Sequence, residues 1–168
     1  AAATLLTDRE AGGEPRIGPF VYGTDGRGAD DLIVPTSGMR RRAADTAVEE
    51  YTDRHGNTRS DHNIFMNGRA VVEFTLREVP RAVRETCDKA GITLDDVDAV
   101  VPHQASAMVL DGIRDRLGLP EEKFVVCMDD IGNTVSCSVP IALKRAVLTG
   151  QIKPGALVLL VGFGVGLS

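Results

Sequence analysis

The sequence has few cysteines and no apolar run longer than a strand, and both shortages narrow the possible functions. Cys87, Cys127 and Cys137 form no Cys-x-x-Cys pair and no spacing typical of a metal site. An odd number of scattered cysteines is typical of a reducing compartment, so we predict a cytoplasmic protein. The longest apolar stretch, residues 156–161, has the length of a strand and is followed by glycines, so we expect no transmembrane helix.

Positive charge is also in short supply. The chain carries 19 Lys and Arg against 24 Asp and Glu, a net charge of −5, whereas a nucleic-acid-binding protein needs a basic face. We therefore expect no nucleic-acid partner. The first residues lack the basic start and long apolar run of a signal peptide, and with no transmembrane helix expected we predict no membrane partner. The chain lacks an initiator Met and stops at Ser168, after a glycine-rich turn where another strand is expected. We therefore interpret it as truncated at both ends.

From residue 68 onward the apolar pattern becomes regular. Apolar residues recur at steps of three or four, as on one face of a helix, and these are Val72, Leu76, Val79, Val83 and Cys87. The pattern predicts a helix over residues 68–90, kinked or divided at Pro80 and closed by Gly91. Before this helix we expect strands near residues 3–6 and 20–22, then a long loop over residues 23–63. Loops of that length are usually functional or cover a site.

Strands and helices then alternate to the end of the chain. We expect strands at 97–101, 124–128 and 157–161, and helices at 106–117 and 136–149. Ser106 is a suitable N-cap for the first of these two helices. This order predicts an α/β fold with a mostly parallel sheet and right-handed crossovers.

Three polar or glycine-rich signals follow the strands of this predicted sheet. His103 follows the first, Asn133 the second, and the glycines of residues 162–166 the third. The carboxyl ends of parallel strands are where reactive groups gather. Each signal alone is weak: a single histidine is as often structural, Gly132-Asn133 is typical of a tight turn, and the glycine-rich end lacks the lysine of a P-loop.

Several ordered motifs together are more specific. They are Met-Asn-Gly at 66–68, Val-Pro-His-Gln-Ala at 101–105, Gly-Asn-Thr at 132–134, Ser-Val-Pro-Ile-Ala-Leu at 138–143, Lys-Pro-Gly at 153–155 and Gly-Phe-Gly-Val-Gly-Leu-Ser at 162–168. In this order, and with Asn133 30 positions after His103, the chain resembles the C-terminal half of β-ketoacyl-acyl carrier protein synthase III. The resemblance implies a thiolase-like fold, with residues 1–168 as its C-terminal domain and the N-terminal half and last strand outside the chain.

The resemblance also implies a decarboxylative Claisen condensation of an acyl primer with malonyl-acyl carrier protein. His103 and Asn133 then stabilise the enolate thioester, with His103 neutral and donating from one ring nitrogen. The backbone N–H of Val165 completes an oxyanion hole, although many relatives have glycine there. The nucleophilic cysteine comes from the N-terminal half, because no cysteine of this chain matches its position. This chain alone is then inactive.

Substrate and partner contacts follow from the same resemblance. Acyl-coenzyme A and malonyl-acyl carrier protein are substrates, and no metal or redox cofactor is required. The residues expected to contact the pantetheine arm are Asn67, Gly68, Val72, Ala105 and Ser106. Ser106 replaces the usual asparagine, so it either binds through its hydroxyl or serves only as an N-cap. Partners are the N-terminal half, acyl carrier protein and a second copy in a homodimer.

Other functions stay open from the sequence. One is an acyltransferase on the same scaffold, which needs a base but has less use for Asn133. Another is a non-catalytic partner subunit of a condensing enzyme, in which His103 and Asn133 need not have been kept. A stand-alone α/β domain is a third. Primer length, and fatty-acid against polyketide metabolism, are not distinguished by this sequence.

Half of a thiolase fold has an apolar face that normally packs against the other half. We therefore predict that the isolated chain exposes an apolar patch larger than a few hundred Å², binds a hydrophobic dye and self-associates. Light scattering and dye fluorescence measure this. A monodisperse monomer that binds no dye contradicts the half-enzyme interpretation.

Overall fold

The computed structural model describes residues 1–5, 17–39, 41–164 and 167–168. The chain divides into two compact units. The first is built from Ala1–Tyr22 and Thr75–Phe163, and the second from Gly23–Phe74 and Gly164–Ser168. Among the described residues, none of the helices combines the length and the apolar character needed to cross a membrane.

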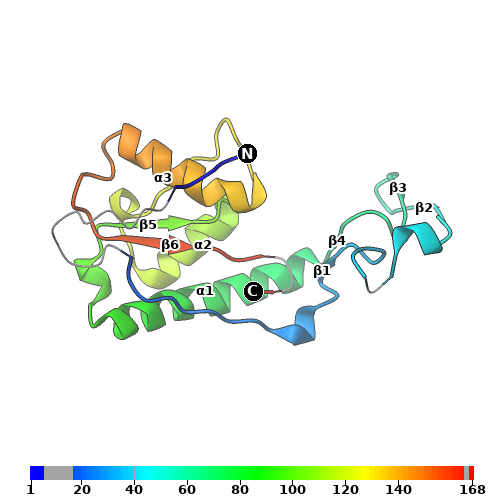
Figure 1. Cartoon of the computed structure of the whole chain (residues 1–168), viewed down its shortest axis with the longest axis horizontal. Helices are drawn as coiled ribbons and strands as arrows, with labels where there is room; N and C mark the ends of the chain where they lie inside the picture. The colour runs from blue at the N-terminus through cyan, green and yellow to red at the C-terminus, as the bar shows by residue number, and fades with distance from the viewer. Residues whose placement is uncertain (6–16, 40, 165–166) are drawn as a thin grey trace. The chain divides into compact units, whose positions relative to one another are not determined.

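The centre of the first unit is a parallel pair of strands, β5 (Ala99–Pro102) and β6 (Val158–Val161), which lie side by side in Figure 1. All four residues of β5 are buried, as expected of a strand covered on both faces. On its other edge, Val100 pairs with Phe124 in a parallel bridge, and Val125 N–H donates to Val100 O at 2.9 Å. The predicted parallel arrangement of three chain segments is therefore present, with β5 in the middle.

The strand expected over residues 124–128 is wrong, because only the bridge at Phe124 forms there. The fully buried side chain of Gln104 accounts for the difference. Its Nε2 donates to Pro102 O at 2.8 Å and to Val125 O at 3.2 Å, and its Oε1 accepts from Cys127 N–H at 2.8 Å. A glutamine amide thus takes the place of further ladder hydrogen bonds and satisfies backbone groups that burial would otherwise leave unpaired.

Two shorter helices follow the pattern of the sequence. Helix α2 (Ala107–Leu117) begins at Ser106, whose hydroxyl accepts from Val109 N–H, and ends at Gly118 with φ of 70°. Helix α3 (Ser138–Leu148) begins two residues later than expected, because Val135–Cys137 forms a 3₁₀ turn. That turn matters for the site described below.

Helix α1 (Gly68–Ala90) is continuous, so the expected division at Pro80 does not occur. In the first unit its residues pack closely on α2. A Cβ atom at Gly112 would lie 2.7 Å from Leu76 Cδ2, so a larger residue there would require the Leu76 side chain to move. Arg84 also donates from its guanidinium to Arg116 O at 2.6 Å.

The core lies on both faces of β5. On one face Ala99 and Val101 pack with Ala142 and Ala146 of α3, and these small residues bring the helix close to the strand. Side chains alternate along a strand, so Val100 points to the opposite face. Figure 1 shows α3 on one side of the strand pair and α1 on the other. The buried residues of α1 and α2 in this unit are Thr75, Val79, Pro80, Val83, Cys87, Val109, Leu110, Ile113 and Leu117.

The second unit contains short antiparallel pairs where a long loop was expected. Strand β1 (Leu32–Ile33) pairs with β4 (Phe65–Met66), and β2 (Tyr51–Thr52) pairs with β3 (Thr58–Arg59). The turn of the latter hairpin is held by Asp53. The backbone N–H of Asn57, followed by its side-chain amide, lowers the Asp53 pKa to about 2.

The two strands expected near the N-terminus are not seen. Residues 18–22 form no strand, and neither do residues 3–5, while Leu6 lies outside the described residues. The apolar pattern of these short segments predicted strands, but short apolar runs are ambiguous without long-range partners.

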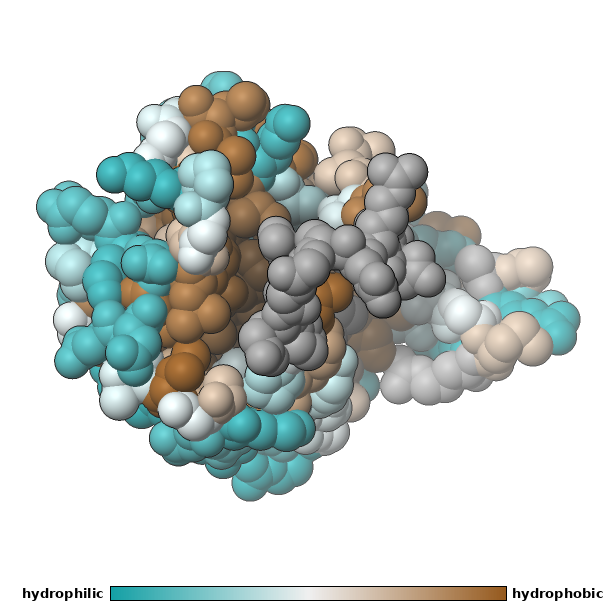
Figure 2. Space-filling model, turned by 60° about the vertical axis from the view of Figure 1, so that its left-hand side comes forward, coloured by the Kyte–Doolittle hydropathy of each residue, from teal (hydrophilic) through white to brown (hydrophobic). Residues whose placement is uncertain are grey.

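The first unit carries much apolar surface. Figure 2 shows a band of hydrophobic side chains running across one face of the molecule. Strand β6 pairs with β5 alone among the described strands, and its Leu160 is 55% exposed. Other large exposed apolar residues of this unit include Val126, Val147, Leu148 and Leu157.

The buried amide of Gln104 provides a direct test of the fold. In Gln104→Leu, two carbonyls and one N–H lose their partner inside the protein. We expect the free energy of unfolding to fall by at least about 2 kcal/mol, because each unpaired buried group costs about 1–3 kcal/mol. Urea unfolding followed by circular dichroism measures the loss.

The matched control is Gln151→Leu, since Gln151 is an exposed glutamine that donates to Glu122 O. It should change the unfolding free energy by less than about 0.5 kcal/mol. Equal losses for the two variants would contradict a structural role for the Gln104 amide.

Candidate functional site

His103 lies immediately after β5, at the carboxyl end of the central strand. Its backbone N–H donates to Val161 O at 2.7 Å, which continues the ladder between β5 and β6. The half-buried ring contacts Phe163 edge to face, with 5.2 Å between the ring centroids. The strand pair therefore fixes the backbone of His103, and Phe163 shields one part of its ring.

Ser138, the first residue of α3, fixes the orientation of the imidazole. Its Oγ lies 2.6 Å from His103 Nδ1 and accepts from Gln104 N–H at 3.1 Å. The same hydroxyl donates to Val135 O at 2.7 Å. The Ser138 side chain is completely buried, so these contacts are not shared with solvent. Nδ1 of His103 is thereby engaged, and Nε2 is the ring nitrogen left for chemistry.

Asn133 is held beside the same segment. Its Nδ2 donates to Ala105 O at 3.4 Å, and its Oδ1 accepts from Val135 N–H at 2.9 Å. An amide carries two N–H groups, and one remains after these contacts. The side chain is exposed, so this second N–H is available to a ligand.

Val135 joins the two functional side chains through its backbone. Its N–H holds Asn133, and its carbonyl holds Ser138, which in turn contacts His103. Val135 has a φ of 55°, which is uncommon for any residue but glycine and costly for a β-branched one. Such strain, of order 1–3 kcal/mol, is found where surrounding contacts over-determine the backbone, often at functional sites.

The electrostatics of the site favour a neutral imidazole. Burial lowers the pKa of His103 from 6.5, because the charged ring loses hydration, and the carbonyl of Val135 acts in the opposite direction. Around neutral pH the ring therefore carries one proton.

The first unit thus brings together four of the residues predicted from the sequence. His103 and Asn133 are linked through Val135 and Ser138, and Ala105 contributes the carbonyl that Asn133 contacts. Ser106 serves as the N-cap of α2, which is one of the two roles expected for it. Whether its hydroxyl also contacts pantetheine stays a prediction.

The other predicted residues lie in the second unit or outside the described residues. Asn67, Gly68 and Val72 lie at the start of α1 in the second unit. Asn67 caps that helix, since its Oδ1 accepts from Ala70 N–H, and its Nδ2 donates to Asp31 Oδ1 at 2.8 Å. Val165, the expected oxyanion-hole residue, lies outside the described residues.

Sequence reasoning missed the two residues that orient the site. Ser138 was noticed only as the start of a Ser-Val-Pro motif, and Val135 was not noticed. A serine at the start of a helix is ordinarily interpreted as a cap, and nothing in a sequence signals a positive φ at valine. The contact of Phe163 with His103 was also missed, because the segment around Phe163 was interpreted only for its glycines.

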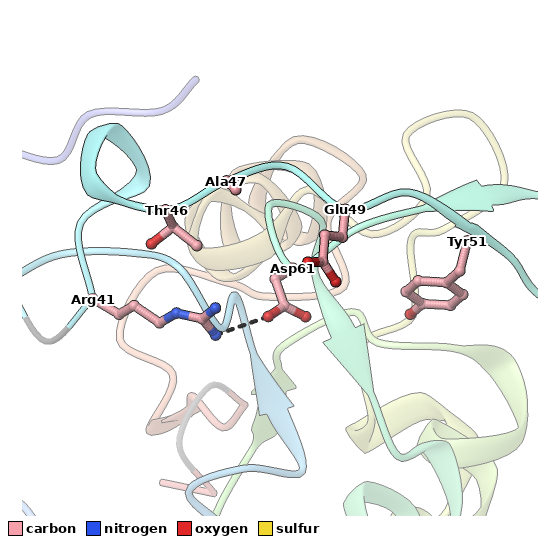
Figure 3. A pocket seen from close by; sticks show the side chains of 6 residues that line it. All are labelled: Arg41, Thr46, Ala47, Glu49, Tyr51 and Asp61. Atoms are coloured by element: carbon pink, nitrogen blue, oxygen red, sulfur yellow. Dashed lines mark hydrogen bonds and ion pairs between the residues drawn. The ribbon is translucent and has the colours of Figure 1, made fainter.

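A separate hollow of about 260 Å³ lies in the second unit (Figure 3). Its lining residues are Arg41, Thr46, Ala47, Glu49, Tyr51 and Asp61. Arg41 and Asp61 form an ion pair across it at 2.8 Å, so its two opposite charges neutralise one another. It has no histidine, cysteine or amide side chain, and the His103 cluster is the better candidate site.

The chain is similar in sequence to known proteins of one family. Residues 87–168 match the model of the 3-oxoacyl-[acyl-carrier-protein] synthase III C-terminal domain. The β-ketoacyl-[acyl-carrier-protein] synthase III of Symbiobacterium thermophilum is 39% identical over 147 residues, which cover 88% of this chain and 42% of that protein. The corresponding protein of Caldanaerobacter subterraneus is 34% identical over 99% of this chain and 47% of its own length.

Solved structures agree. A 3-oxoacyl-(acyl-carrier-protein) synthase III superposes with a TM-score of 0.86 at 45% identity, covering 94% of this chain and 47% of that one. The priming β-ketosynthase of the R1128 polyketide pathway gives a TM-score of 0.74 at 35% identity, covering 92% and 43%. The predicted resemblance and the thiolase-like α/β fold are confirmed, and the chain spans about half the length of these relatives.

Titration of His103 tests the environment of the site. We expect it to take up its second proton below pH 6.5, measured from the Cε1–H resonance by NMR. Because the pKa is lower in the folded than in the unfolded chain, the unfolded chain binds more protons between the two values. The free energy of unfolding should therefore decrease as pH falls from 6.5 towards the folded pKa.

His103→Gln should remove this part of the pH dependence and leave the rest. A His103 that titrates at or above pH 6.5 contradicts the described burial.

Proposed function

We propose that this chain, which carries the C-terminal domain of the 3-oxoacyl-acyl carrier protein synthase III family at residues 87–168, supplies half of a condensing active site. The reaction is the decarboxylative Claisen condensation of an acyl thioester primer with malonyl-acyl carrier protein, in the cytoplasm. The observation that carries the proposal is the pairing of His103 and Asn133 through one turn. Each keeps a polar atom, Nε2 or the second amide N–H, that the fold does not use.

The chemistry fits these two groups. Loss of carbon dioxide from a malonyl thioester leaves an enolate, with negative charge on the thioester oxygen. Donors fixed in advance around that oxygen stabilise the charge without having to reorganise during the reaction. His103 and Asn133 are held by the backbone of Val135 and by Ser138, so their cost of reorganisation is small. No metal or redox cofactor has a step in this reaction.

The acyl group needs a nucleophile that this chain is not suited to supply. Burial raises the pKa of the Cys87 thiol and of the Cys127 thiol, so neither is an activated thiolate. Cys87 is also buried in helix α1. We therefore assign the nucleophilic cysteine to an N-terminal half, which would cover the apolar surface of the first unit and complete the site.

Further contacts belong to the same proposal. We expect the pantetheine arm of acyl-coenzyme A or acyl carrier protein to be contacted by Asn67, Gly68, Val72, Ala105 and Ser106. The backbone N–H of Val165 binds the oxyanion of the acyl-transfer step. The working enzyme is a homodimer that docks acyl carrier protein.

Acylation of the cysteine and decarboxylation of the malonyl thioester can be tested separately in enzyme assembled from this chain and the cysteine-bearing half. In His103→Ala and Asn133→Ala, release of carbon dioxide from malonyl-acyl carrier protein should fall about 10²–10³-fold for each donor lost. Labelling of the cysteine by radioactive acyl-coenzyme A should continue, because the enolate forms only in the later step. Carbon dioxide release and acyl labelling are measured in parallel.

The matched control is His55→Ala, since His55 is an exposed histidine in the β2–β3 turn and should leave both steps unchanged. Acyl transfer to an amine or alcohol without loss of carbon dioxide would favour an acyltransferase instead. Full activity in both site variants would indicate a non-catalytic partner subunit.

A further inference from the structure

Ser138 has a hydrogen-bonding arrangement that admits one assignment of protons. A hydroxyl has one hydrogen to donate and two lone pairs to accept. Ser138 Oγ has three neighbours at hydrogen-bonding distance: Val135 O at 2.7 Å, Gln104 N at 3.1 Å and His103 Nδ1 at 2.6 Å. Val135 O can only accept and Gln104 N–H can only donate. Val135 O also accepts from the backbone N–H of Ser138, but two oxygens 2.7 Å apart need a hydrogen between them, and only the hydroxyl can supply it.

The contact with His103 follows from this count. Because the Ser138 hydrogen points to Val135 O, only a lone pair of Oγ remains for His103. Ser138 Oγ and His103 Nδ1 are 2.6 Å apart, and they would repel each other if both presented a lone pair. A hydrogen must therefore lie on Nδ1. All three hydrogen-bonding positions of the hydroxyl are then satisfied, as expected of a side chain with no exposed surface.

We infer that Ser138 is a positioning residue that holds neutral His103 in its Nδ1–H form, so that Nε2 presents a lone pair to the site. Nε2 has no hydrogen-bond partner among the described residues of the chain. In this form Nε2 is an acceptor, and it donates to a thioester oxygen only after it has taken up a proton from solvent water. This rests on the proposed function, and it alters the expected role of the ring, since a neutral His103 does not donate from Nε2.

In this arrangement Asn133 and His103 differ as hydrogen-bond donors. The second amide N–H of Asn133 is a donor at every pH, because an amide does not titrate in this range. His103 is a donor at Nε2 only as the imidazolium, which binds an oxyanion more strongly than a neutral donor does. Since burial lowers the His103 pKa, the ring is neutral around neutral pH.

The tautomer is read directly from a long-range ¹H–¹⁵N NMR spectrum of the ¹⁵N-labelled 168-residue chain, above the pH at which His103 titrates. We expect the protonated type of ¹⁵N shift at Nδ1 and the unprotonated type at Nε2. In Ser138→Ala this preference should be lost, with the ring moving to the Nε2–H form or to a mixture. The opposite pattern in the unsubstituted chain overturns the inference.

Ser136→Ala is the matched control, because Ser136 is an exposed serine two residues away and should leave the tautomer unchanged. If Ser138→Ala does not fold, Ser138→Cys takes its place, since a thiol is similar in shape but a weak hydrogen-bonding group. An unchanged Nδ1–H form in a folded Ser138 variant would show that another contact sets the tautomer. No turnover is involved, so failure here is distinct from failure of the condensation assay.

Discussion

The site depends on the backbone of one strained residue. Val135 adopts a φ of 55°, and its N–H and carbonyl then point to Asn133 and Ser138. Through Ser138 the carbonyl also determines the orientation of the His103 ring. The side chains of His103 and Asn133 are 30 residues apart in the sequence, and their positions relative to each other are fixed because one turn holds both. Hydrogen bonds of the Val135 N–H and carbonyl stabilise this strained conformation.

Buried polar side chains serve the fold and the site together. Gln104 replaces the missing strand hydrogen bonds between β5 and residues 125–127, and its backbone N–H donates to Ser138. His103 precedes it directly, so the histidine is fixed by the strand on one side and by this network on the other. Such networks tolerate substitution poorly, since each lost partner leaves another buried group unpaired. Stability and function are coupled here because both use the same few hydrogen bonds.

Much of this was predictable from the sequence, and the failures have physical reasons. Helices α1 and α2 and strands β5 and β6 were predicted because their apolar periodicity is strong. The strand at 124–128 was wrong because a side chain, Gln104, supplies the hydrogen bonds that a strand would make. His103 and Asn133 were predicted from their places after strands and from the family motifs. Ser138 and Val135 were missed because burial, positive φ and a shared hydroxyl are properties of the folded chain.

The central claim is that His103 and Asn133 bind the same thioester oxygen. It is tested most directly by a crystal structure of the enzyme completed with its cysteine-bearing half, bound to a malonyl-pantetheine analogue that cannot lose carbon dioxide. We predict that the oxygen equivalent to the thioester carbonyl lies about 2.7–3.1 Å from Asn133 Nδ2, and equally close to His103 Nε2 in crystals grown below the pH at which the ring becomes protonated. An oxygen that contacts neither nitrogen, with the analogue held elsewhere, would contradict the claim.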